Sequence, residues 1–146
     1  MSDVDMLLER AKALKLHGVI THWNEIKGEW VEQLISWEEK ERTRRSLTRR
    51  LGNAHLGRFK LLAQFDWGWP KVCERQVIEE LMELSFLKDG RNVILCGPNG
   101  VGKSTIACNI AYQTVIKGRT ALFSTAGNLL NELASLDGDV ALQRRL

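Results

Sequence analysis

The chain has 146 residues, of which 44% are apolar and 27% are charged, a balance typical of a folded protein rather than a disordered one. Lysine and arginine total 21 against 18 aspartates and glutamates, so the net charge is only +3. A nucleic-acid surface would therefore have to come from local clustering of charge. No apolar run approaches the ~20 residues of a membrane helix. The sequence predicts a chain without a transmembrane span.

The N-terminus and the cysteines indicate the compartment. The first ten residues carry two aspartates where a secretory signal would carry lysine or arginine. Cys73, Cys96 and Cys108 are odd in number and form no CxxC pair, so we expect reduced thiols rather than disulfides or a zinc site. The three histidines have no metal-ligand partners at a suitable spacing. These features predict a cytoplasmic protein.

The first half of the sequence predicts helices throughout. Apolar residues recur at steps of three and four over residues 3–16, and Gly18 is a typical helix end. Thr21 is expected to cap a second helix with an apolar side over residues 23–34. Ser36 begins an S-x-x-E capping box, which predicts the start of a third helix there.

Three tryptophans in this half, Trp23, Trp30 and Trp37, stand at intervals of seven residues. They could form an aromatic row presented to a partner or to bases. Alternatively, they fill the core of a small helical bundle that has few other large side chains, and we favour this interpretation.

Residues 40–60 are strongly basic, with eight lysines and arginines against the single acidic residue Glu41. Arg42, Arg45 and Arg49 fall roughly on one helical face. Such a run can be an ordinary solvated face. Charge of almost one sign favours contact with the phosphate backbone of DNA, largely independent of base sequence.

The second half predicts a parallel α/β arrangement, because apolar runs of strand length alternate with helical patterns. Before it, the aromatic run FDWGWP at residues 65–70 predicts a linker that packs against a neighbouring element. The elements expected after this linker are a helix over residues 74–87, a strand over 92–96, a helix over 103–117, a strand over 120–123 and a helix over 128–136.

A glycine-rich motif of the form G-x-x-x-x-G-K-[ST] lies between the first predicted strand and the following helix. Its glycines let backbone N–H groups surround an anion at a helix N-terminus. Lys103 would reach the β- and γ-phosphates of a nucleoside triphosphate, and the Ser104 hydroxyl would bind Mg²⁺. The expected nucleotide-binding residues are Gly97, Pro98, Asn99, Gly100, Val101, Gly102, Lys103, Ser104 and Thr105.

Hydrolysis of the nucleotide needs a second acidic site at the end of an apolar strand. After Ser104 the carboxylates are Glu132, Asp137 and Asp139, and none has that position in the predicted elements. We therefore name no catalytic residue, and whether the chain is an enzyme stays open.

The sequence from Asn92 to Asp139 resembles the IstB-like group of AAA+ ATPases, helper proteins of insertion-sequence transposition that are related to DnaC-type helicase loaders. The similarity includes the phosphate loop, the alanine-rich helix ending at Lys117, the short strand with Phe123 and the segment 128–130. Upstream, the region around Ser36 and the basic helix are similar to the helical N-terminal domain of that family, though more loosely.

The resemblance implies a fold and a function. It implies a helical N-terminal domain over residues 1–70 that binds DNA or a partner, followed over residues 71–146 by the first part of a P-loop (AAA+/RecA-like) parallel-sheet ATPase domain. Because the family continues into the second acidic motif, we expect the sequence to be an N-terminal part of such a protein. The implied ligands are ATP and Mg²⁺, and the implied partners are DNA, a transposase and further copies of the chain.

Two other functions remain open. A DnaC-type helicase loader would use the same ATP chemistry with a helicase as its partner. Alternatively, only the N-terminal helices fold, and the chain is a non-catalytic module that binds DNA or a partner.

Overall fold

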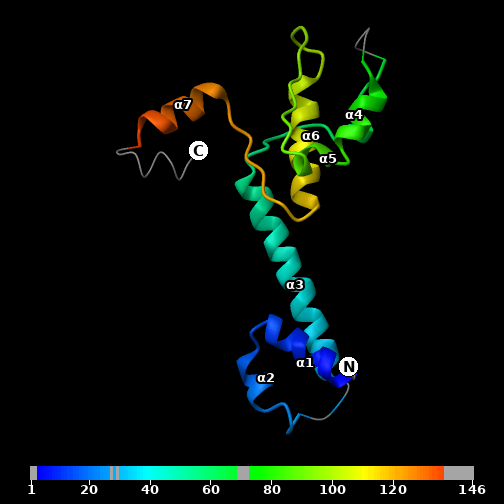
Figure 1. Ribbon diagram of the computed structural model, residues 1–146, viewed down its shortest axis with the longest axis vertical. Coiled ribbons are helices and arrows are strands. Elements are labelled where there is room, and N and C mark those ends of the chain that lie inside the picture. Colours follow the sequence, from blue (N-terminus) through cyan, green and yellow to red (C-terminus); the bar gives the residue numbers. More distant parts are fainter. Residues whose placement is uncertain (1–2, 27, 29, 69–72, 137–146) are drawn as a thin grey trace. The chain divides into compact units, whose positions relative to one another are not determined.

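The computed structural model describes residues 3–26, 28, 30–68 and 73–136 (Figure 1). The structure divides into two compact units, residues 1–49 and 50–146. The predicted domain boundary near residue 70 stays a prediction. The helices of the described residues are α1 (Asp3–Ala13), α2 (His17–Thr21), α3 (Trp30–Asn53), the 3-10 turn η1 (Leu62–Gln64), α4 (Arg75–Leu81), α5 (Ser85–Lys88), α6 (Lys103–Ile116) and α7 (Ala126–Ala134).

The core of the first unit joins α1 to α3. Aspartates in the first turn of α1 and basic residues in its last turn complement the helix dipole. Ala11 and Leu14 are buried against Val31 and Ile35 of α3, and apolar side chains from residues 16–26 pack around them. The predicted first helix is thus confirmed over most of its length. Its apolar face is buried towards the C-terminal end, at Ala11 and Leu14, whereas Val4 in the first turn is 62% exposed.

An ion pair also connects α1 to α3. The Arg10 guanidinium donates two hydrogen bonds to the Glu39 carboxylate, Nε to Oε1 at 2.9 Å and Nη2 to Oε2 at 2.7 Å. This fork geometry suits arginine and a carboxylate. Hydrogen bonding from Arg10 holds the pKa of Glu39 below its ordinary value.

We expect this pair to make the stability of the first unit depend on pH. Because the pKa of Glu39 is lowered by folding, its contribution is present at neutral pH and is lost as pH falls through that lowered pKa. Glu39→Gln should therefore unfold at lower urea concentration than the parent near pH 7, and the difference should vanish in acid. Urea unfolding over a pH series measures this. A difference that stays constant down to acid pH would contradict it.

The helix α3 runs without a break through Ser36, so the capping box predicted there is wrong. Val31 and Ile35, one turn apart, are buried on the same face, and a helix end at Ser36 would interrupt that face. Thr21 is not a cap either: it lies at the end of α2, and its hydroxyl donates to the His17 carbonyl at 2.9 Å.

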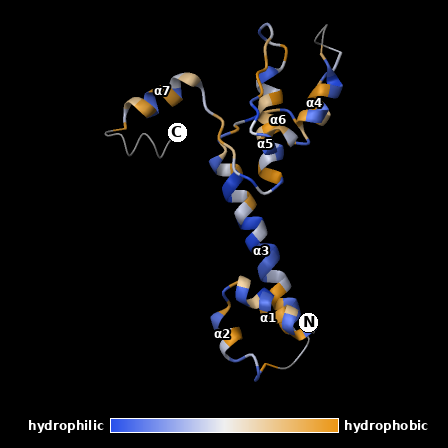
Figure 2. Cartoon of the chain, viewed as in Figure 1, coloured by the Kyte–Doolittle hydropathy of each residue, from blue (hydrophilic) through white to orange (hydrophobic). Residues whose placement is uncertain are grey.

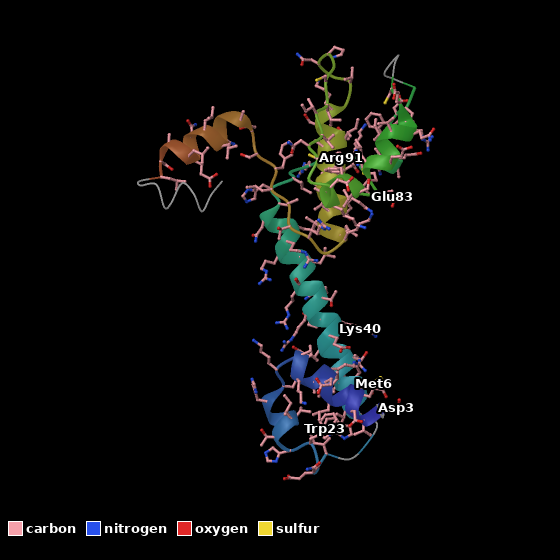
Figure 3. All side chains as sticks on the ribbon, in the orientation of Figure 1. Asp3, Met6, Trp23, Lys40, Glu83 and Arg91 are labelled. Atoms are coloured by element: carbon pink, nitrogen blue, oxygen red, sulfur yellow. The ribbon has the colours of Figure 1, made fainter. Side chains whose placement is uncertain are left out.

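Of the three tryptophans predicted to fill a helical core, one packs against the core and two are exposed. Trp23, labelled in Figure 3, is half-buried against the α1–α3 core. Trp30 and Trp37 are 53% and 61% exposed, so the prediction that all three fill a core is wrong for these two. Val31 and Ile35 occupy the core-facing positions of α3 instead.

Figure 2 shows that α3 is hydrophilic along most of its length, as its basic middle part requires. In the ranges that the structure describes, no helix is both long enough and apolar enough to cross a membrane.

The core of the second unit forms around α6. Ile106, Cys108 and Val115 of this helix are buried, and so are Ala54, Ile78 and Leu84 from other segments of the unit. Burial raises the pKa of the Cys108 thiol, which keeps it protonated at neutral pH. The predicted helix over residues 103–117 is confirmed as α6.

The helix predicted over residues 74–87 is interrupted in the structure. It forms as α4 and α5, separated by Leu84 in a left-handed conformation with φ 61°. The Lys117 ammonium donates to the carbonyls of Met82 and Glu83, each at 3.2 Å. These bonds satisfy carbonyls that the interruption leaves outside a regular helix.

The prediction of a parallel sheet is wrong: no strand or sheet forms in the described residues. A strand is stable only when its backbone pairs with a neighbouring strand, and neither predicted strand, 92–96 or 120–123, has one in this part of the chain. Among the residues that the structure describes, the second segment is held by one backbone hydrogen bond, from the Phe123 N–H to the Ala54 carbonyl at 2.9 Å. Ile94, in the middle of the first predicted strand, is 83% exposed, whereas a strand inside a parallel sheet would be buried.

Candidate functional site

The glycine-rich loop leads directly into α6, the arrangement that the motif predicts. Gly100 and Gly102 have φ values of 82° and 95°, in the left-handed region that favours glycine. The turn at Gly102 lets the helix begin at Lys103. The first N–H groups of a helix have no partner within it and attract anions. The loop therefore precedes a helix N-terminus of the kind that binds phosphate.

The Lys103 side chain folds back over this loop. Its ammonium donates to the carbonyl of Gly97 at 2.9 Å and to that of Pro98 at 2.6 Å. The positive charge is thus held beside the loop backbone rather than extended into solvent. A phosphate bound by the loop would lie next to an ammonium that is already in place, so these residues fit a nucleotide phosphate.

Phe65 packs against the loop from a distant part of the sequence. A Cβ added to Gly102 would lie 2.5 Å from Cε2 of the Phe65 ring, so only glycine fits there while the ring stays in place. Trp67 meets Phe65 edge-on with the ring centroids 4.9 Å apart, and the Arg75 guanidinium lies 5.1 Å from the centroid of Trp67. The packing predicted for the aromatic linker is confirmed at Phe65 and Trp67, while residues 69 and 70 lie outside the described residues. Sequence reasoning did not identify the phosphate loop as the neighbour.

Asn109 is a second residue that sequence reasoning missed. It is buried in α6, where its Oδ1 accepts from the Leu62 N–H at 2.8 Å. Its Nδ2 donates to the Lys60 carbonyl at 2.9 Å and to the Thr105 carbonyl at 2.8 Å. One amide therefore ties the segment before Phe65 to the first turns of α6. A lone asparagine among apolar helix residues was the only signal for it in the sequence.

Replacing Asn109 by leucine should destabilise the second unit by about 1–3 kcal/mol, because the half-buried Leu62 N–H would lose its partner at similar side-chain volume. Urea unfolding followed by circular dichroism measures the change. Asn131→Leu, at an exposed position of α7, is the matched control and should shift stability by no more than about 0.5 kcal/mol. Equal effects of the two variants would contradict a stabilising role for the Asn109 amide.

The remaining predicted site residues lie at or beside the loop. Pro98, Asn99 and Ser104 are exposed, and Thr105 is half-buried in the first turn of α6. Exposure leaves the Ser104 hydroxyl accessible to a metal ion. The only cation held over the loop by a hydrogen bond in the described residues is that of Lys103.

The acidic residues considered for hydrolysis do not complete the site. Glu132 lies in α7 and lines a separate pocket of about 390 Å³ together with His55 and Asn128. None of residues 97–105 lines that pocket. Asp137 and Asp139 are outside the described residues.

The three arginines predicted to contact DNA do lie on one face of α3. Arg42, Arg45 and Arg49, with Ser46, line a shallow concavity of about 310 Å³. Basic side chains project into solvent from this part of the helix, where Lys40 is labelled in Figure 3. We call these three arginines the arginine face.

Nearby carboxylates partly neutralise the arginine face, so its net positive charge is smaller than the composition of residues 40–60 predicts. Arg42 Nε lies 2.6 Å from Glu38 Oε1, and Arg45 Nη2 lies 3.7 Å from the same oxygen. Arg45 Nε is also 3.6 Å from Glu41 Oε1. Glu38 precedes the basic segment, so counting charges within that segment overlooked it. Arg49 forms no ion pair with any residue that the structure describes.

A glycine-rich loop that ends in lysine at the start of a helix is the arrangement by which P-loop proteins bind nucleotide phosphates. The family profile described as "IstB-like ATP binding protein" matches residues 9–146. The chain belongs to this family.

Two individual relatives support this family assignment. A protein of insertion sequence IS21 from Pseudomonas aeruginosa, named for ATP binding, is 32% identical over 143 residues, which are 98% of this chain and 51% of the relative. A protein of insertion sequence IS5376 from Geobacillus stearothermophilus, also named for ATP binding, is 32% identical over 119 residues, or 81% of this chain and 47% of the relative. The chain thus spans about half the length of the curated relatives it matches.

Proposed function

We propose that the chain binds ATP through residues 97–105. The observation that carries this proposal is the Lys103 ammonium held over the glycine-rich loop by the Gly97 and Pro98 carbonyls. In the bound state, the ammonium would exchange these neutral acceptors for phosphate oxygens. Phosphate oxygens carry net negative charge and attract the ammonium more strongly than the carbonyl dipoles do, so the exchange favours binding.

Mg²⁺ would enter with the nucleotide rather than bind beforehand. No cluster of three or more metal-ligating side chains exists among the described residues. Ser104, exposed in the first turn of α6, offers one hydroxyl, and phosphate oxygens and water would supply the other ligands. Mg²⁺ would thereby neutralise charge on the phosphates while the backbone N–H groups and Lys103 orient them.

A series of adenine nucleotides tests this proposal. Lys103 acts on the β- and γ-phosphates, so ATP and ADP with Mg²⁺ should raise the unfolding temperature of the chain, and AMP should not. At a ligand concentration of 100 Kd the stabilisation is about 2.7 kcal/mol. Equal shifts with AMP and ATP would place binding outside the loop, and no shift with any nucleotide would refute the proposal.

A second proposed activity is DNA binding by the arginine face. Support comes from the concavity of about 310 Å³ that Arg42, Arg45 and Arg49 line together. Arginine binds phosphate bidentately. The contact would be electrostatic, because phosphate contacts carry no base identity. Affinity should fall steeply with salt, and a flat salt response would count against it.

Together these activities describe an ATP-dependent helper of DNA transposition. The curated relatives are named as insertion-sequence proteins, which favours a transposase over the helicase of a DnaC-type loader as the partner. Assembly with further copies of the chain on DNA, in the cytoplasm, belongs to the same proposal. Co-purification with the transposase of the same element, compared with the replicative helicase, distinguishes the two partners.

A non-catalytic role for the chain is the alternative. ATP would then cause no stabilisation, while DNA binding by α3 would persist. The nucleotide series and a DNA titration on the same preparation separate this alternative from the helper function.

A further inference from the structure

The arginine face contains its own anion. Glu38 precedes Arg42 by one helical turn, and its Oε1 lies 2.6 Å from Arg42 Nε and 3.7 Å from Arg45 Nη2. One carboxylate oxygen thus approaches two of the three arginines that line the concavity. A carboxylate and a phosphate present similar oxygens to a guanidinium, so both compete for the same donors.

We propose that Glu38 is an internal competitor of DNA phosphate on the arginine face, which a bound phosphate displaces from Arg42 and Arg45. This inference rests on the proposed DNA binding and adds how the strength of that binding is set. DNA affinity is held down because each contact with Arg42 or Arg45 requires breaking an interaction with Glu38.

The ion pairs are weak enough to be displaced. The side chains of Arg42, Arg45 and Glu38 are 43%, 59% and 31% exposed, so water and salt screen their attraction. Exposed pairs at i and i+4 contribute little to stability. A DNA backbone presents a row of phosphates, one negative charge per about 1.7 Å of helix axis. These phosphates together attract the arginines much more strongly than the single carboxylate of Glu38 does.

Arg49 differs from Arg42 and Arg45 in having no competing carboxylate among the described residues. It lies one turn beyond Arg45 and can therefore bind phosphate without breaking an ion pair. We therefore expect Arg49 to make the first contact, and Arg45 and Arg42 to follow as Glu38 is released. Glu41 also forms an ion pair with Arg45, at 3.6 Å, but its closer ion pair is with Arg44, at 2.7 Å.

The test compares Glu38→Gln with Glu32→Gln. Both substitutions remove one negative charge from α3 and keep the side-chain shape. Glu32 is exposed and ten residues from Arg42, about 15 Å along the helix, which exceeds the screening length of about 10 Å at 0.1 M salt. The probe is a fluorescent duplex oligonucleotide, titrated by anisotropy over a range of salt concentrations. Thermal unfolding shows that both variants are folded, and added inorganic phosphate tests whether a free anion competes for the site.

We expect Glu38→Gln to bind the duplex about two- to fivefold more tightly than the parent at low salt, because no ion pair with Glu38 has to be broken before Arg42 and Arg45 contact phosphate. Glu32→Gln should match the parent. Unchanged affinity of Glu38→Gln, or an equal gain in both variants, overturns the competition while the DNA function stands. If neither the parent nor Glu38→Gln binds the duplex, the DNA function fails and the inference fails with it.

Discussion

Lys103→Ala is expected to lower the affinity of the chain for ATP by about a hundredfold or more. The ammonium is the only cation held over the loop by hydrogen bonds in the described residues, and two charge-assisted bonds to phosphate at about 1.5 kcal/mol each correspond to a loss of that size. Isothermal titration with Mg-ATP measures it. The fold should persist, because the Lys103 ammonium donates its hydrogen bonds to carbonyls of the exposed loop residues Gly97 and Pro98.

Lys88→Ala is the matched control for this experiment. Lys88 is an exposed lysine at the end of α5, in the same unit but outside the loop, so its removal should leave ATP affinity unchanged. Lys103→Arg is a further comparison, since a guanidinium keeps the charge but not the compact shape of the ammonium, and we expect weakened binding. ATP affinity that survives Lys103→Ala would exclude the loop as the binding site.

Reversing two charges of the arginine face should have the second largest effect. In Arg45→Glu/Arg49→Glu, two cations that line the concavity become anions. We expect DNA affinity at low salt to fall by about a hundredfold and the slope of log affinity against log salt to become shallower by about two, one for each lost phosphate contact. Anisotropy titrations at several salt concentrations measure both quantities.

Lys88→Glu/Arg119→Glu is the matched control, because it changes the net charge by the same amount at two positions outside the arginine face. Both residues are exposed in the second unit, so the variant separates a local contact from the general effect of net charge. DNA affinity should remain close to that of the parent. Equal losses in the two double variants would mean that α3 has no special part in DNA binding.

The local signals in the sequence were sufficient for several helices. The apolar periodicity of residues 3–16 identified α1, and the glycine-rich motif located the start of α6 at Lys103. For α7, the prediction placed the helix two residues late, because Thr125 caps it by accepting from the Asn128 N–H at 3.2 Å. These elements depend on contacts between residues a few positions apart, which a sequence pattern records directly.

Local signals failed where a partner element decides the structure. Residues 92–96 have the composition of a strand, but a strand depends on backbone pairing with another segment, and no described segment provides it. The capping box at Ser36 is likewise overruled by the buried positions Val31 and Ile35, which favour a continuous α3. The strand propensity has no effect without a pairing partner, and the burial of Val31 and Ile35 outweighs a capping preference worth about 1 kcal/mol.

By itself, the sequence determined the family, the loop with its lysine and the arginine face, because each depends on residue types at short spacing. Only the tertiary structure brought Phe65 onto Gly102, linked Asn109 to the Leu62 N–H and Lys60 carbonyl, and joined Arg10 to Glu39. The hydrogen bonds among these contacts connect residues that are 29 to 49 positions apart in the sequence. Such pairs leave no periodic signal, since they form only when packing of the apolar faces brings distant segments together.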